Sequence, residues 1–112
     1  MFELRYYLKA NGVSPFAKWF EDIEAVAAAK IVRAIARMES GNFSNVKPVG
    51  EGVLEFRIDF GPGYRIYFGR DGDRLIILLT GGTKKRQQRD IETAIILWRD
   101  YKARRQPHKG VE

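Results

Sequence analysis

Basic side chains that could hold a phosphate gather in two regions of this sequence. The denser one follows an apolar run and a glycine pair, in LLTGGTKKRQQR at residues 78–89, and contains Lys84, Lys85, Arg86 and Arg89. Upstream, Arg57 and Arg65 lie in two segments that alternate apolar and polar residues. A guanidinium presents a planar fork that matches phosphate oxygens. Cations that converge on one phosphate would stabilise the charge that develops when a phosphodiester is cleaved.

The overall charge favours a polyanionic partner. The net charge is +6 and the isoelectric point is near 9.8. The excess is uneven, because residues 84–112 carry nine basic and four acidic side chains. A local positive field attracts nucleic acid first, although many basic proteins bind none. Charge alone therefore leaves nucleic-acid binding and a simply solvated surface open.

Composition excludes several other classes of chemistry. The 112 residues suit one domain, which we assign to residues 1–112. The absence of cysteine excludes disulfides, thiolate catalysis and cysteine-ligated zinc. His108 is the single histidine, so no paired-histidine mechanism or multi-histidine metal site is possible, and we expect no metal or cofactor. No apolar run is long enough to span a membrane and no signal peptide is recognisable, so a cytoplasmic location is expected.

The N-terminal half has a helical pattern. A short strand candidate at residues 2–8 ends at Asn11-Gly12. Ser14-Pro15 is typical of a helix start. A second helix is predicted from residue 24 to residue 40, ending at Gly41. Its apolar stripe consists of Ala27, Ile31, Ala34, Ile35 and Met38. A separate basic stripe consists of Lys30, Arg33 and Arg37, which we interpret as a solvated face.

The second half changes to the two-residue period of strands. We predict a loop at residues 41–52, then strands at 53–60, 64–70 and 73–80. A third helix is expected from residue 87 to residue 103, with residues 105–112 as a flexible tail. The order β-α-α-β-β-β-α predicts an α+β domain. It has a small antiparallel sheet of about four strands, two N-terminal helices and one C-terminal helix.

The turns predict which side chains share a face of this sheet. A two-residue loop at Asp71-Gly72 would pair Phe68 with Leu75. A three-residue loop at residues 61–63 would pair Phe60 with Tyr64. One face then carries Glu55, Arg57, Arg65, Tyr67, Ile76, Leu78 and Thr80. The two arginines could clamp one phosphate there, or they could simply pair with Glu55 and Asp59.

The sequence also resembles a known family. The stretches VLEFRIDFGPGYRIYF (53–68) and LIILLTGGTKKRQQRDIETA (75–94) are similar to the RelE/ParE toxin superfamily. Within it they most resemble the phage-derived, HigB-like branch of addiction-module killer proteins. The likeness is most specific over residues 53–94, and SPFAKWFEDI (14–23) with the helix pair fits the same family.

This resemblance implies a RelE-like fold and a toxin held inactive by a cognate antitoxin. Most RelE-like toxins cleave mRNA without metal, on the translating ribosome, whereas ParE-like relatives inhibit DNA gyrase. The positions that match the family's phosphate-holding cations are Arg57, Arg65, Lys84 and Lys85. Lys47 is a looser match. No tyrosine between Tyr67 and Tyr101 corresponds to the C-terminal catalytic tyrosine of some relatives.

The expected function is therefore a metal-independent mRNA endoribonuclease that inhibits translation. We expect Arg57 and Arg65 to clamp the phosphate, with Lys84 or Lys85 as a further clamp or acid. RNA contacts are expected from Lys47, Tyr67, Arg86 and Arg89. The general base stays open between Lys85, whose pKa neighbouring cations would have to depress, and Glu55. A gyrase inhibitor and an inactive RNA- or ribosome-binding relative are the alternatives.

Overall fold

The computed structural model describes residues 1–105, which form five strands and three α-helices. In chain order they are β1 (Glu3–Tyr6), α1 (Pro15–Glu21), α2 (Ala25–Glu39), β2 (Val46–Gly50), β3 (Val53–Ile58), β4 (Tyr64–Asp71), β5 (Leu75–Thr83), the 3-10 turn η1 (Lys84–Arg86) and α3 (Gln87–Arg104). The expected tail lies outside the described residues apart from Arg105, and His108 lies outside them too. Over the described part of the chain, none of the helices combines the length and apolarity needed to cross a bilayer.

The α+β class is confirmed, and the sheet has one strand more than expected. The strand order is β1-β5-β4-β3-β2, with β1 parallel to β5 and the other neighbours antiparallel. The extra strand is β2, in the segment that we predicted as a loop. Its glycine, asparagine and proline content disfavours a strand. Pairing with β3 overrides that preference, since Lys47 lies opposite Glu55 and Val46 opposite Phe56.

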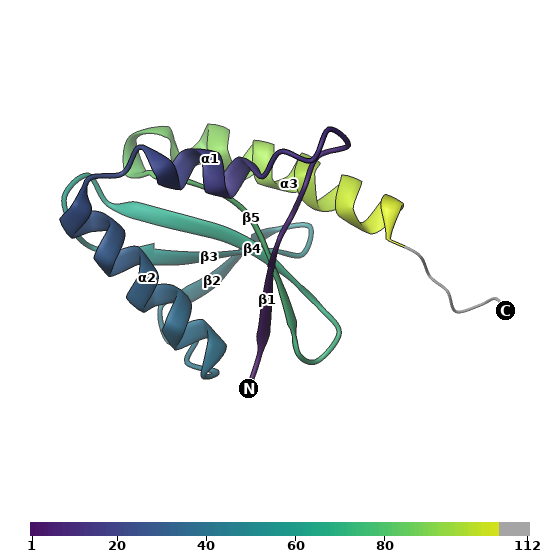
Figure 1. The fold of residues 1–112 in the computed structure, drawn as a ribbon, viewed down its shortest axis with the longest axis horizontal. Coiled ribbons are helices and arrows are strands. Elements are labelled where there is room, and N and C mark those ends of the chain that lie inside the picture. The colour runs from purple at the N-terminus through teal and green to yellow at the C-terminus, as the bar shows by residue number, and fades with distance from the viewer. Residues whose placement is uncertain (106–112) are drawn as a thin grey trace, which may run out of the picture.

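Helices cover both faces of the sheet (Figure 1). One face holds a core of α1 and α2 side chains, including Phe16, Ile31 and Met38, against Phe56, Ile66 and Phe68 of the strands. The other face holds a second core, in which Ala94, Leu97 and Trp98 of α3 contact Val53, Tyr67, Ile77 and Leu79. The sheet is therefore the middle layer, and any open polar site has to lie at its edges or ends.

Local capping sets the start of both N-terminal helices as predicted. The Ser14 hydroxyl accepts a hydrogen bond from the Ala17 N–H at 3.0 Å, and proline follows at the first helical position. The Glu24 carboxylate accepts from the N–H groups of Val26 and Ala27, at 3.0 and 2.9 Å. These caps satisfy backbone donors that have no partner within the helix.

The predicted register of β3 with β4 is wrong by two residues, but its assignment of faces survives. Arg57 lies opposite Arg65, and Glu55 lies opposite Tyr67. Side chains alternate with a period of two, so a two-residue shift leaves each side chain on its predicted face. Glu55, Arg57, Arg65 and Tyr67 therefore do share one side of the sheet.

The predicted register of β4 with β5 is wrong in a way that changes the faces. Phe68 lies opposite Leu78 rather than Leu75, because the loop between the strands starts one residue later than predicted, at Gly72, and holds three residues instead of two. Ile76 and Leu78 therefore point toward the α1 and α2 core, and the expectation that they flank the arginines fails. A bulge beside Tyr67 then shifts the pairing by one residue. This bulge returns Thr80 to the position opposite Tyr67, on the expected face.

The glycine pair that follows the apolar run is part of a strand and forms no turn. Gly81 and Gly82 lie within β5, opposite Ile66 and Arg65. A Cβ at Gly81 would lie 2.3 Å from the Trp19 ring, and one at Gly82 would lie 1.9 Å from Asp90 Oδ2. Their missing side chains let α1 and the start of α3 approach the two faces of one strand.

Candidate phosphate-binding pocket

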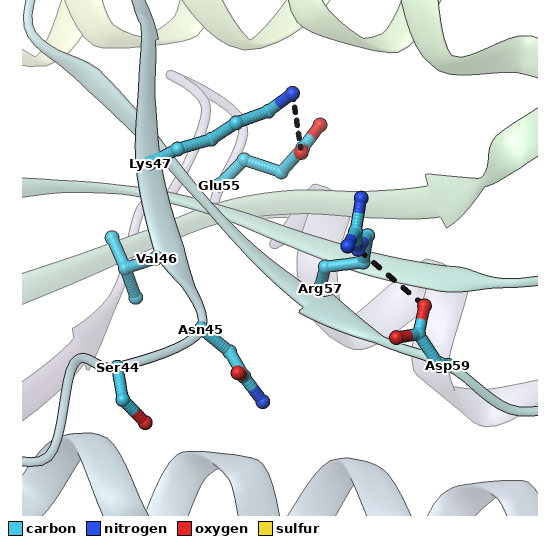
Figure 2. Close-up of a pocket in the computed structure, with 7 residues that line it drawn as sticks. All are labelled: Ser44, Asn45, Val46, Lys47, Glu55, Arg57 and Asp59. Carbon is cyan, nitrogen blue, oxygen red and sulfur yellow. Dashed lines mark ion pairs between the residues drawn. The ribbon is translucent and has the colours of Figure 1, made fainter.

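A cavity of about 220 Å³ lies where β2 and β3 meet on the α3 side of the sheet. We call this cavity the β2–β3 pocket. Its wall consists of Ser44, Asn45, Val46, Lys47, Glu55, Arg57 and Asp59 (Figure 2). It brings together two of the predicted cations, Lys47 and Arg57. The two come from neighbouring strands, because Lys47 lies opposite Glu55 and the Arg57 N–H donates to the Asn45 carbonyl at 3.2 Å.

Both cations have carboxylate partners on the same wall. Lys47 Nζ lies 4.0 Å from Glu55 Oε1, and Arg57 Nε lies 3.4 Å from Asp59 Oδ1. Figure 2 shows Lys47 reaching over Glu55 and Arg57 turned toward Asp59. The structure therefore contains the alternative pairing that the sequence left open, in which Arg57 pairs with Asp59 and Arg65 lies beside Glu55. The Arg57 side chain is 52% exposed, and such exposed pairs contribute little stability, so an incoming phosphate could displace Asp59.

Glu55 is the unusual group in this pocket. Its side chain has no exposed surface, yet it is a carboxylate. Oε2 accepts a hydrogen bond from Gln87 Nε2 at 2.9 Å and lies 3.9 Å from Arg65 Nε. Oε1 has no hydrogen-bond partner in the described residues and lies nearest to Lys47 among the cations. A buried acceptor usually has a partner, so a carboxylate oxygen that is buried beside a pocket without a hydrogen bond is a candidate general base.

Arg65 lies behind the pocket wall and not on it. The residue is only 4% exposed, and Nη1 donates to the Gly63 carbonyl at 2.7 Å. The Lys84 N–H donates to the same carbonyl at 2.9 Å. Arg65 and the backbone of Lys84 therefore meet at the β3–β4 loop, but neither side chain lines the pocket, so the predicted clamp of both on one phosphate is not formed there. The burial of Arg65 suits a residue that holds Glu55 and η1 in place.

Tyr67 is also buried, on the strand position opposite Glu55. Burial raises the pKa of Tyr67, and the negative charge of Glu55 raises it further. The hydroxyl therefore keeps its proton at neutral pH. It is buried without a hydrogen bond of standard geometry in the described residues, and it lies close enough to the Glu55 carboxylate for that group to raise its pKa.

The remaining predicted cations form an exposed group on η1 and the first turn of α3. Lys84, Lys85, Arg86 and Arg89 are all exposed, and none of them lines the β2–β3 pocket. Burial raises the pKa of nearby Asp90, while Arg86 and Arg89 lower it. These four side chains therefore present a positive surface at the end of β5, separate from the pocket wall.

Tyr101 has a structural role on α3. Its ring stacks on Trp98 with centroids 5.2 Å apart, and its hydroxyl donates to Asp71 Oδ2 at 2.7 Å. Burial and this hydrogen bond raise the pKa of Tyr101 to about 12. The same bond lowers the pKa of Asp71. Tyr101 thus fastens the last turns of α3 to the end of β4, as expected for a residue on the helix stripe.

Replacing Tyr101 with phenylalanine is expected to reduce the free energy of unfolding by about 1 kcal/mol at pH 7. Because the folded-state pKa of Asp71 is depressed, this stabilisation is complete above the unfolded-state pKa of about 3.9 and is lost as pH falls through the folded-state value. Urea unfolding of both proteins at neutral and acidic pH checks the prediction. An equal difference at both pH values would contradict it.

Sequence reasoning overlooked two kinds of pocket residue. Gln87 was assigned only as the start of a helix, although its amide holds Glu55. Ser44 and Asn45 were assigned to a loop, although they lie on the pocket wall. Gln87 follows Lys84 by three residues, about one helical turn. This spacing is only a weak signal that the Gln87 amide belongs to the site. Nothing local indicates that Asn45 lies beside Arg57.

Together these features define a small basic α+β protein with a pocket that is lined by two cations and a buried carboxylate. Residues 18–99 match the family model described as phage derived protein Gp49-like (DUF891), and the chain belongs to this family. It is a family of the toxin type found in toxin–antitoxin modules.

The chain is also similar to a bacterial protein. The chain is 42% identical over 83 residues to an uncharacterized protein of Haemophilus influenzae (strain ATCC 51907 / DSM 11121 / KW20 / Rd). The matched region covers 73% of this chain and 84% of that protein. The similarity therefore extends over most of both chains.

Proposed function

We propose that this protein is the toxin of a toxin–antitoxin module, a member of the RelE/ParE superfamily, and a metal-independent mRNA endoribonuclease. One observation carries the catalytic part. Within residues 1–105 the buried Oε1 of Glu55 accepts no hydrogen bond, and Glu55 lines the same pocket as the cations of Lys47 and Arg57. A base can remove the proton of the ribose 2′-hydroxyl, and cations can stabilise the charge that develops on the phosphate.

In the proposed reaction Glu55 Oε1 accepts the proton of the 2′-hydroxyl. The 2′-oxygen attacks phosphorus, the bond to the 5′-oxygen breaks, and the products carry a 2′,3′-cyclic phosphate and a 5′-hydroxyl. Arg57 exchanges Asp59 for the phosphate and stabilises its developing charge. The Lys47 ammonium is the candidate proton donor to the leaving oxygen.

The other predicted site residues take supporting roles in this proposal. Buried Arg65 is a positioning residue that holds Glu55 and the β3–β4 loop. Exposed Lys84, Lys85, Arg86 and Arg89 bind the RNA backbone on either side of the cleaved bond. Tyr67 is a positioning residue beside Glu55 and, being buried, is not available to stack on a base.

The partners follow from the same proposal. The substrate is mRNA, and cleavage takes place on the translating ribosome in the cytoplasm. A cognate antitoxin holds the toxin inactive in unstressed cells. A short open reading frame for a helix-turn-helix protein beside this gene would support that arrangement.

Replacing Arg57 with alanine is expected to lower RNA cleavage by a factor of about 10²–10³, because one donor to the transition-state charge is lost. The side chain is half exposed and pairs only with Asp59, so the fold should persist. The measurement is growth after brief induction, with primer extension on transcripts to locate new 5′ ends. Arg74→Ala removes an exposed cation at the far end of the sheet and serves as the control.

The outcomes of this induction separate the candidate functions. Growth arrest with new transcript ends from the wild type, but not from Arg57→Ala, supports the nuclease. Arrest with DNA damage and intact transcripts identifies a gyrase inhibitor instead. Normal growth with the wild-type protein indicates an inactive binding relative. Equal toxicity of folded Arg57→Ala and wild type contradicts the assignment of Arg57.

A further inference from the structure

A second cavity of about 220 Å³ lies on the other side of Arg57, between α2 and the end of β3. We call it the α2 groove. Its charged lining consists of Lys30, Arg33 and Arg37 from α2, with Arg57 and Asp59 from β3. The basic stripe that sequence analysis interpreted as a solvated face therefore forms one wall of a groove, and Arg57 stands on the opposite wall.

The positive charge of this groove is largely uncompensated. Lys30, Arg33 and Arg37 take part in no ion pair within residues 1–105. Lys30 Nζ instead lies 4.7 Å from the centroid of the Phe60 ring. The one carboxylate in the lining, Asp59, already pairs with Arg57. Four cations against one acid leave a field that attracts an anionic chain.

The groove adjoins the β2–β3 pocket. Both cavities are lined by Asn45, Arg57 and Asp59. A strand with one phosphate at Arg57 would therefore enter the α2 groove with its next phosphates. From Lys30 to Arg37 the helix rises about 10 Å, at about 1.5 Å per residue. That length corresponds to roughly three nucleotides at about 3.4 Å each in a stacked strand.

We propose that the α2 groove binds the sugar–phosphate backbone of single-stranded RNA next to the phosphate held at Arg57. This inference rests on the proposed function, since it assigns the same substrate a second contact surface. An evenly spaced row of unpaired cations suits an evenly charged backbone, and the shared wall residues connect it to the pocket. The contact contributes affinity without base specificity, because phosphates carry no sequence information.

Binding of a short single-stranded RNA with a 2′-methoxy group on every ribose tests this inference, because that RNA lacks the nucleophile and cannot be cleaved. The variant is K30A/R33A/R37A, in which alanine preserves helix propensity. The control is K9A/R74A/K102A, which removes the same charge from exposed positions outside both cavities. Fluorescence anisotropy at several salt concentrations gives the Kd and its salt dependence.

We expect the groove variant to bind RNA at least about tenfold more weakly near 0.1 M salt. The slope of log K against log salt should also be smaller in magnitude by about 2, because each phosphate contact to a single strand contributes roughly 0.7 to that slope. The control should change much less in both measures. Equal losses in the two variants, or no binding by the wild type, would overturn the inference. So would a groove variant that binds RNA normally but no longer binds an antitoxin.

These outcomes are distinct from a failure of the proposed function. Cleavage by the wild type that depends on Arg57 but not on the three α2 cations would retain the nuclease and reject the groove. RNA binding that depends on the groove, without any cleavage, would retain the groove and reject the nuclease.

Discussion

Glu55→Gln is expected to lower the rate of RNA cleavage by a factor of about 10²–10⁴, the usual contribution of a general base. Glutamine has nearly the same shape and can still accept the hydrogen bond from Gln87. It lacks the negative charge that would remove the 2′-hydroxyl proton. The rate is measured on a short RNA under single-turnover conditions, with circular dichroism to show that the variant is folded.

A second variant separates catalysis from stability in this test. Glu55→Gln leaves the Arg65 guanidinium buried without its carboxylate, which destabilises the fold. The double variant E55Q/R65Q leaves no unpaired buried charge, so it should recover stability to urea without recovering cleavage. A double variant that cleaves RNA at the wild-type rate would exclude Glu55 as the base.

Gly81→Ala is expected to destabilise the protein by about 3 kcal/mol, at the upper end of the usual range for overpacked sites. The new methyl group would lie 2.3 Å from the Trp19 ring. That ring cannot move away freely, because it contacts Phe16 and Tyr64 at centroid distances of 5.6 and 6.3 Å. Urea denaturation of the purified protein gives the change in free energy of unfolding.

The cause of this loss of stability can be tested in a variant that lacks the Trp19 ring. In Trp19→Leu the clash is relieved, so Gly81→Ala should cost much less there than in the wild type. The difference between the two costs is the interaction energy of a double-mutant cycle. If Gly81→Ala costs the same in both backgrounds, the close approach of Trp19 is not why glycine occupies this position.

Several parts of the candidate site were predictable because they depend on neighbours in sequence. The Ser14 cap and the start of α3 near residue 87 rest on local hydrogen bonds and periodicity. The common face of Glu55, Arg57, Arg65 and Tyr67 rests on strand alternation, which tolerated a register error of two residues. The corresponding error at β4–β5 was three residues, an odd number, so Ile76 and Leu78 were assigned to the wrong face.

The sequence by itself determined the fold class, the three helices, the positive charge and the set of candidate cations. Only the tertiary structure decided that Arg65 is buried, that Glu55 Oε1 is buried without a hydrogen bond in the described residues, and that the α2 cations line one groove with Arg57. The physical reason is separation along the chain. Caps and strand alternation act over a few residues, whereas burial and groove walls are made by segments that meet only when the sheet and helices assemble.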